Sequence, residues 1–226
     1  MEKHFAIFLL VCLTTLSFSC DYSLENNQDD KLSELTSSKI FSDKFLEFQG
    51  DPDFEVINLE NVSNFSTLID RMQTLSCEDK YTGITYQFND TIYHQYGYVE
   101  CPTSDVISCF MNRNTIHIKN DSLMNYRASL DSLYPINSLA HQLNTMKHVD
   151  YYNSVGEPVL KQILIYLNIE DHYPISKTKE VLAEVEKQFT KANKEKSDNY
   201  YRYMIFFEKY SKTDIPLPPP PPELKD

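Results

Sequence analysis

The chain has 226 residues, a length typical of one domain, and 41% of them are hydrophobic, which is enough to build a core. Its formal net charge of −12 disfavours binding to the phosphate backbone of nucleic acids. Only 4 glycines are present, so glycine-rich loops that cradle phosphates or dinucleotides are not expected. These numbers predict an acidic globular protein that has no nucleic acid as a partner.

The N-terminal segment combines a polar start with an apolar run, from Phe5 to Phe18, that ends at Ser19 and Cys20. This run is typical of a signal-peptide core and is shorter than the roughly 20 residues that span a bilayer. A cysteine directly after a small residue at this point resembles the lipobox of bacterial lipoproteins, in a loose form similar to that of Bacteroidota. The resemblance implies that residues 1–19 are a signal peptide and that Cys20 becomes the acylated first residue of the mature chain.

Lipidation would determine where the protein is located. Each buried methylene contributes about 0.8 kcal/mol, so several acyl chains such as palmitate hold a protein firmly on a membrane. We therefore expect a protein of the cell envelope, lipid-anchored to a bacterial membrane on its periplasmic or surface face. A plain secretory signal with an incidental cysteine is the alternative. Residues 20–40 are polar and acidic and are expected to form a flexible tether to a globular domain over residues 41–212.

The cysteines of the expected mature domain allow one disulfide, which an oxidising envelope permits. Cys101 and Cys109 are close in the sequence, and the polar, proline-containing segment between them can turn the chain. We expect this pair, with Cys77–Cys101 as the alternative. Neither a CxxC motif nor a Cys/His grouping with zinc spacing occurs, so no metal site is expected.

The first half of the globular region contains strand and helix patterns in turn. Residues 54–59, FEVINL, are typical of a strand. After them, apolar residues at helical spacing predict a helix that Asn61 or Ser63 would cap. The apolar residues of this helix are Phe65, Leu68, Ile69 and Met72.

A hairpin is the clearest local signal in the chain. Strand-forming segments at 81–88 and 91–101 flank Asn89-Asp90, a turn whose residues tolerate positive φ. Tyrosines crowd both segments, and we expect them to pack across the strands of a half-buried sheet rather than to form a sugar-binding face. They are Tyr81, Tyr86, Tyr93, Tyr96 and Tyr98.

The second half has a more regular pattern. Residues 114–119 alternate like a strand. Residues 137–147 predict a helix with Asn137 as its candidate cap. Its apolar face consists of Leu139, Leu143 and Met146. Residues 162–169 form a continuous apolar run, as expected of a strand that is covered on both faces.

A long helix and a last strand complete the pattern. Ser176 is expected to cap a helix that continues to about Asn193, and residues 200–210 predict a strand. The inward residues of the helix are Val181, Leu182, Val185 and Phe189. This succession predicts an α+β fold in which a mixed sheet packs with two or three helices in a single domain.

The C-terminal residues 213–226 are rich in proline. Five consecutive prolines, Pro218–Pro222, cannot donate backbone hydrogen bonds and favour polyproline II. We expect a stiff exposed tail, with docking on an aromatic groove of a partner as the alternative.

Motifs for catalysis are missing from the sequence. No GxSxG serine elbow occurs, and His141 and His148 are seven residues apart, whereas zinc-binding helices use a spacing of four with a glutamate between. His148 and His172 each lie near an acidic residue, which leaves a hydrolase as a minority hypothesis. We expect no catalytic residue and no cofactor.

The pattern of residues 116–210, with ILIYLNIEDHYPISKTKEVLAEVEKQF at its centre, resembles the periplasmic domain of the ExbD/TolR proton-motor accessory family. In that family too, a strand is followed by a polar turn, a long helix and another strand. The resemblance implies an accessory component of envelope energy transduction as an alternative function. The family also uses a transmembrane helix that carries a proton-accepting Asp, and residues 5–19 contain no Asp.

Three Asp-Ser/Thr-apolar triplets look like the sites that Bacteroidota O-glycosylate on exported proteins. Their acceptor hydroxyls belong to Thr91, Ser122 and Ser132. Together with the Cys20 motif they predict a cell-envelope lipoprotein with a non-enzymatic binding or structural role, whose partner is another envelope protein. An immunity lipoprotein that neutralises a toxin also fits a small, acidic, anchored chain.

Overall fold

The computed structural model describes residues 38–102, 115–124, 133–145, 161–194, 196, 200–211 and 214. These residues belong to one compact unit that begins at Ser38. Strand β1 (Ser38–Phe41) includes residues 38–40, so the sheet begins slightly before the predicted end of the tether at residue 40.

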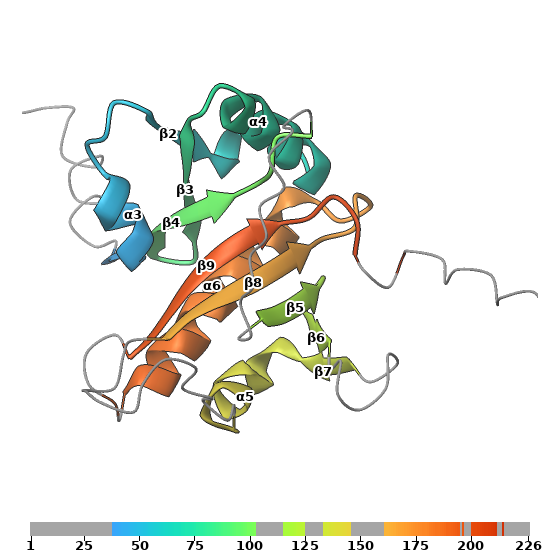
Figure 1. The fold of residues 1–226 in the computed structure, drawn as a ribbon. Coiled ribbons are helices and arrows are strands. Elements are labelled where there is room, and N and C mark those ends of the chain that lie inside the picture. Colours follow the sequence, from blue (N-terminus) through green and yellow to red (C-terminus); the bar gives the residue numbers. More distant parts are fainter. Residues whose placement is uncertain are drawn as a thin grey trace, which may run out of the picture. The chain divides into compact units, whose positions relative to one another are not determined.

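Figure 1 shows the helices and strands of the described residues. Up to residue 98 they are β1, α3 (Asp43–Phe48), β2 (Phe54–Asn58), a 3-10 turn (Leu59–Asn61), α4 (Phe65–Cys77), β3 (Tyr81–Phe88) and β4 (Thr91–Tyr98). From residue 115 they are β5 (Thr115–Lys119), β6 (Ser122–Met124), β7 (Leu133–Pro135), a 3-10 turn (Ile136–Ser138), α5 (Leu139–Thr145), β8 (Lys161–Asn168), α6 (Ile175–Asn193) and β9 (Tyr201–Phe207).

The strands form one mixed sheet in the order β2-β3-β4-β9-β8-β5-β6-β7, and β1 pairs with β4 off this path. The pairs β3–β4, β5–β6 and β6–β7 are antiparallel, and all the others are parallel. The sheet and its helices confirm the predicted α+β class. Four α-helices are described, one more than the upper end of the expected number.

Two βαβ units organise the sheet. In β2–α4–β3 and in β8–α6–β9, a helix connects two neighbouring parallel strands and therefore packs back onto one face of the sheet. Residues of α4, α5 and α6 belong to one buried cluster with the inward side chains of the sheet, so these helices cover the same face. The strand, helix and strand that the sequence predicts between residues 162 and 210 are β8, α6 and β9.

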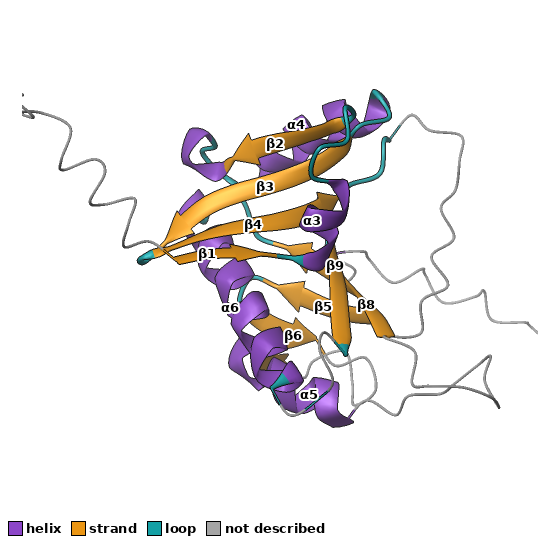
Figure 2. Cartoon of the chain, turned by 90° about the vertical axis from the view of Figure 1, so that its left-hand side faces the viewer, coloured by secondary structure: helices purple, strands orange, loops and turns teal. Residues whose placement is uncertain are grey.

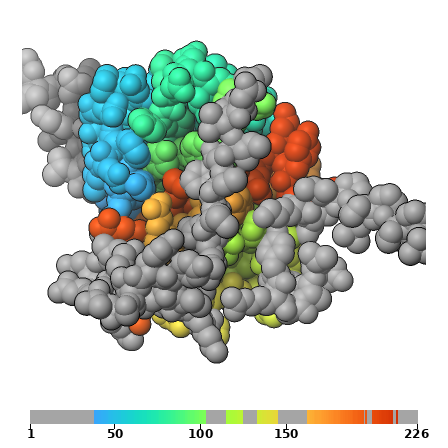
Figure 3. Space-filling model, viewed as in Figure 1, coloured from blue at the N-terminus to red at the C-terminus, as the bar shows by residue number. Residues whose placement is uncertain are grey.

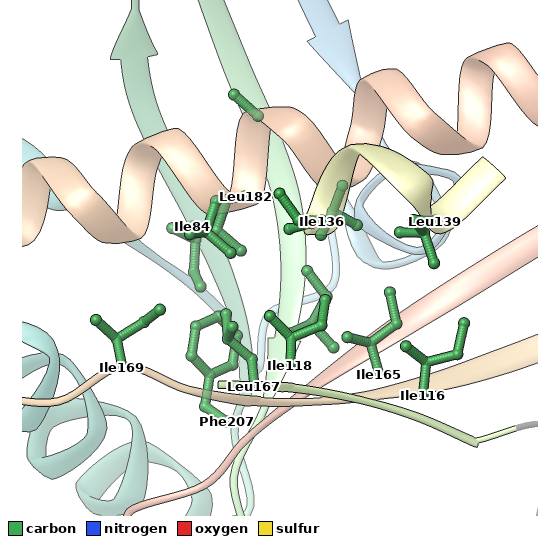
Figure 4. Packing of buried hydrophobic residues seen from close by; sticks show 14 of the residues in the cluster. Ile84, Ile116, Ile118, Ile136, Leu139, Ile165, Leu167, Ile169, Leu182 and Phe207 are labelled. Atoms are coloured by element: carbon green, nitrogen blue, oxygen red, sulfur yellow. The ribbon is translucent and has the colours of Figure 1, made fainter. Parts of the chain in front are cut away.

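The core between these helices and the sheet follows the predicted periodicity. The four residues that define the apolar face of α6 are buried, as are those of α4. Figure 4 shows Leu182 of α6 pointing toward the sheet, where Ile84 and Phe207 lie. Fully burying a side chain such as Leu182 contributes about 1.5–3 kcal/mol, so this face accounts for much of the docking of α6.

Helix α3 covers part of the opposite face. Neighbouring residues of a strand point to opposite faces. Ile84 points to the face that α4, α5 and α6 cover, so Gly83 belongs to the opposite face. A Cβ atom at Gly83 would lie 2.8 Å from the ring of Phe45 in α3 and 2.5 Å from the ring of Phe54. The absence of a side chain at Gly83 therefore allows α3 to approach the sheet closely.

The β3–β4 hairpin has the predicted turn. Asn89 adopts a φ of 51°, in the left-handed region that asparagine tolerates. Tyr86 and Tyr93 are cross-strand partners on the helix-covered face, and their stacked rings are 5.1 Å apart. Tyr96, on the other face, stacks on Phe48 of α3. These tyrosines pack within the domain, as expected.

The predicted capping residues are wrong by one to three positions. Asn64 caps α4, and its side-chain oxygen accepts the Thr67 N–H at 2.9 Å, in place of Asn61 or Ser63. Helix α6 begins after Pro174, so Ser176 lies inside it. Asn137 lies in the 3-10 turn before α5. Several polar residues near each helix start can cap it, and the path of the preceding chain selects one.

Candidate functional site

The sheet divides along β4. Residues 91–94 of β4 pair with β1, whereas only Gly97 and Tyr98 pair with β9. Figure 2 shows β1 beside β4, while β9 runs away at a steep angle. The first residues of β9 thus pair with β8 and not with β4. We call this division of the sheet the fork.

The local sequence explains why β1 stops at the fork. Ser42 follows β1 and caps α3, since its Oγ accepts the Phe45 N–H at 3.3 Å. The same Oγ accepts the Tyr96 N–H at 3.2 Å, and the Ser42 N–H donates to the His94 carbonyl at 2.8 Å. Ser42 therefore ties the β1–α3 turn to β4 at the point where the chain leaves β1 and enters α3.

A cavity of about 330 Å³ lies at the fork. It is bounded by the β1–α3 turn, the C-terminal half of α6 and the start of β9. We call it the fork pocket. Its lining residues are Phe41, Ser42, Asp43, Glu186, Phe189, Thr190, Asn193, Lys194, Lys196, Tyr201, Arg202 and Tyr203.

Glu186 of α6 is a half-buried acid in this pocket. The Tyr203 hydroxyl donates a short hydrogen bond to its Oε2, and the Thr190 hydroxyl lies 3.4 Å from its Oε1. Burial raises the pKa of the Glu186 carboxyl above its usual value; the hydrogen bond from Tyr203 lowers the pKa in part, and the negative charge of Asp43 raises it further. The pocket therefore contains a carboxyl group with a perturbed proton affinity.

A buried polar network holds this acid in place. Gln95 of β4 donates from Nε2 to the Tyr203 hydroxyl at 3.0 Å and to the Leu182 carbonyl at 3.3 Å. The Tyr86 hydroxyl donates to Gln95 Oε1 at 3.1 Å. Burial raises the pKa of Tyr203 well above its usual value, so Tyr203 stays protonated and donates to Glu186. A fully paired network of this kind holds its members in one geometry.

Ion pairs and backbone contacts organise the rim of the pocket. Arg202 Nε lies 3.4 Å from Asp43 Oδ2 and joins α3 to β9. Figure 3 shows blue surface of the α3 region directly against red-orange surface of the C-terminal part of the chain. Asn193, at the end of α6, accepts the Tyr201 N–H at 2.8 Å and donates to the Tyr201 carbonyl at 3.0 Å.

A second, more open cavity of about 520 Å³ lies between β3, β6, β7 and α6. Its carboxylates are already paired with lysines. Asp121 lies 2.7 Å from Lys177, and Glu184 lies 3.0 Å from Lys187. No such pair involves Glu186 within the described residues, so the fork pocket is the stronger candidate site.

The structure corrects the expected disulfide. Cys101 is bonded to Cys77, with Cα atoms 4.9 Å apart, so the preferred Cys101–Cys109 pairing is wrong and the alternative is the one that forms. Cys77 ends α4, and the chain returns at once into β3 beside the end of β4. The hairpin thereby brings residues that are 24 apart in the sequence to one end of the sheet. Cys109 lies outside the described residues.

The other predicted site residues lie apart from the fork pocket or outside the described residues. Thr91 begins β4, and its hydroxyl lies 2.7 Å from that of Ser38. Ser122 begins β6, and its hydroxyl donates to Asp121 at 3.2 Å. Cys20 and Ser132 lie outside the described residues, as do residues 1–19, the expected signal peptide, and residues 215–226 of the expected tail.

No histidine of the described segments lines the fork pocket. His172 lies on the β8–α6 turn with 65% of its side chain exposed and Nδ1 3.8 Å from Glu170. It lines neither cavity. His141 is exposed on α5, and His148 lies outside the described residues. Among the described residues, no group of histidine, cysteine and acidic side chains could hold a metal ion.

Sequence reasoning did not single out Glu186 of the fork pocket or Gln95 of the network beside it. Glu186 follows Leu182 by four positions and precedes Phe189 by three, so it lies on the inward face of α6. Gln95 likewise occupies an inward position of β4, between Tyr93 and Gly97. A polar residue at an inward position of an amphipathic element is the signal that would have identified both.

Comparison with known proteins adds no relative. No protein-family model matches the chain, and no curated protein matches it significantly. Within the described residues, no helix is long and apolar enough to span a bilayer.

Proposed function

We propose that this chain is a lipid-anchored protein of the bacterial cell envelope that binds a ligand or another envelope protein at the fork pocket, without catalysing a reaction. The observation that carries the binding role is Glu186, a half-buried acid in a cavity. Acids with a perturbed pKa in a cleft are concentrated at functional sites, because burying a charge costs folding free energy.

The surroundings of Glu186 favour recognition over acid–base catalysis. In the described part of the chain its contacts are the hydroxyls of Tyr203 and Thr190 and the side-chain amide of Gln95. A hydrolytic site would place a nucleophile or an activating histidine beside the acid. Groups that only donate hydrogen bonds hold the carboxylate in position and leave its remaining lone pairs to a ligand.

The anchor can be tested by metabolic labelling with radiolabelled palmitate. The full chain should take up label, and Cys20→Ala should abolish it. Cys12→Ala is the matched control, because Cys12 lies within the apolar run and its loss should leave labelling unchanged. Equal labelling of Cys20→Ala and the wild type would contradict the anchor.

The binding role can be tested by affinity capture from detergent-solubilised envelopes. Partners should be captured by the wild type and by Glu180→Gln, and should be reduced with Glu186→Gln. Both variants remove one carboxylate from α6 with little change of shape, but Glu180 lies outside the fork pocket. Equal capture by all three proteins would remove the pocket from the proposal.

An envelope energy-transduction accessory of the ExbD/TolR kind is the second candidate. It is supported by the element order β8–α6–β9, which matches the strand, turn, long helix and strand of the resemblance. Its test is co-purification of a membrane-embedded motor subunit with the affinity-tagged full chain. If the captured envelope proteins include no motor subunit, the energy-transduction function is excluded.

A further inference from the structure

Glu186 has unused capacity to accept hydrogen bonds. An ionised carboxylate offers about four lone-pair sites. The hydroxyls of Tyr203 and Thr190 donate to it, and the Thr190 contact is long at 3.4 Å. Within the described residues, no lysine or arginine lies within 4.0 Å of Glu186. The half-buried acid is therefore held in place by neutral donors, and no cation of the described residues is paired with it.

Three other polar groups of the pocket wall are already engaged, and the side chains of Lys194 and Lys196 also line the pocket. The Ser42 hydroxyl accepts two backbone N–H groups. The Asn193 amide is bound on both sides by the backbone of Tyr201. Arg202 pairs with Asp43 at the rim. The interior position at which a ligand would gain most is thus the acceptor Glu186.

The walls around Glu186 are aromatic. Phe189 and Tyr203 pack against each other with ring centroids 4.5 Å apart, and Phe41 lines the pocket from β1. Aromatic faces attract cations as well as apolar groups, because the ring quadrupole is negative above the plane. A carboxylate within aromatic walls is suited to an ammonium group that carries an apolar chain.

We propose that the fork pocket binds the ammonium end of an organic primary amine, with Glu186 as its counter-ion and the walls of Phe41, Phe189 and Tyr203 around its alkyl chain. This inference rests on the proposed function, since it names the chemical class that the same pocket accepts.

The test is a ligand-observed NMR titration of the full chain in non-ionic micelles with three probes of equal length. The probes are n-butylammonium, 1-butanol and butanoate. We expect millimolar binding of n-butylammonium, and binding of 1-butanol and butanoate that is at least tenfold weaker, because only the ammonium pairs with the carboxylate.

Variants assign the binding to the pocket. Glu186→Gln should weaken n-butylammonium binding at least tenfold, whereas Glu180→Gln should leave it unchanged. If Glu186→Gln fails to fold, Asp43→Asn at the rim provides a second variant. It should weaken binding of the ammonium and not that of 1-butanol, because it removes one negative charge from the rim.

Each other outcome would overturn the inference. Equal binding of 1-butanol or butanoate that depends on the pocket would refute the ammonium class but leave the pocket as a binding site. Binding of n-butylammonium that is the same in the wild type and in both variants would place it in the micelle or elsewhere on the chain. Absence of n-butylammonium binding would also refute the inference. In that case the proposed function would still be supported if the wild type captured an envelope partner that Glu186→Gln did not.

Discussion

Loss of the Cys77–Cys101 disulfide should destabilise the domain without disturbing its core. Cys77 is exposed and Cys101 is half-buried, so replacing both with alanine removes little packing. A disulfide stabilises mainly by restricting the unfolded chain, and this one joins residues that are 24 apart. The dependence of loop-closure entropy on loop length gives a loss of about 3.4 kcal/mol in the free energy of unfolding.

The assay is urea unfolding of the full chain, followed by far-UV circular dichroism with and without reductant. With a urea m-value of about 2 kcal/mol/M, a loss of about 3.4 kcal/mol lowers the midpoint by about 1.7 M. We expect Cys77→Ala/Cys101→Ala to unfold at this lower midpoint under both conditions. The wild type should reach the same midpoint only when it is reduced.

Cys109→Ala separates the two pairings that the sequence left open. If Cys77 and Cys101 are joined, this variant keeps the disulfide and still responds to reductant like the wild type. A Cys109→Ala variant that has lost its response to reductant, while Cys77→Ala has kept it, would refute the reasoning. It would show that Cys101 pairs with Cys109 in the folded protein.

Three further changes test the core and the fork pocket. Gly97→Ala should lower the free energy of unfolding by about 1–3 kcal/mol, because the new Cβ would lie 2.7 Å from Phe207 and 2.9 Å from Ile84. An unchanged melting temperature would contradict this prediction. Leu182→Ala should lower the free energy of unfolding in urea by about 2–5 kcal/mol, since Leu182 is 0% exposed. A loss below 1 kcal/mol would contradict this prediction and show that α6 packs loosely. Glu186→Gln should gain stability relative to the wild type as pH rises. The raised pKa of Glu186 means that the folded wild type binds more protons than the unfolded chain, so its stability falls between the unfolded pKa of about 4.3 and the folded pKa. Urea unfolding at pH 4 and pH 7 measures this difference, and equal differences at both values would contradict it.

Local patterns in the sequence determined most of the helices and strands. The spacing of Leu182 and Phe189 predicted the buried face of α6, and Asn89 predicted the hairpin turn, because each depends on residues within a few positions. Short elements such as β1 and α3 were missed. A strand of four residues and a helix of six carry too few periodic positions to stand out from a loop.

Contacts between distant residues were decided by the tertiary structure alone. Gln95 and Tyr203 are 108 positions apart, and their hydrogen bond exists only because β4 and β9 meet beyond the fork. The sequence showed that Glu186 is an acid on an amphipathic helix, but not that the sheet divides beside it and leaves a cavity there. Strand order depends on the packing of the whole chain, whereas helical and strand periodicity depend on local geometry, so the pocket became visible only in the folded domain.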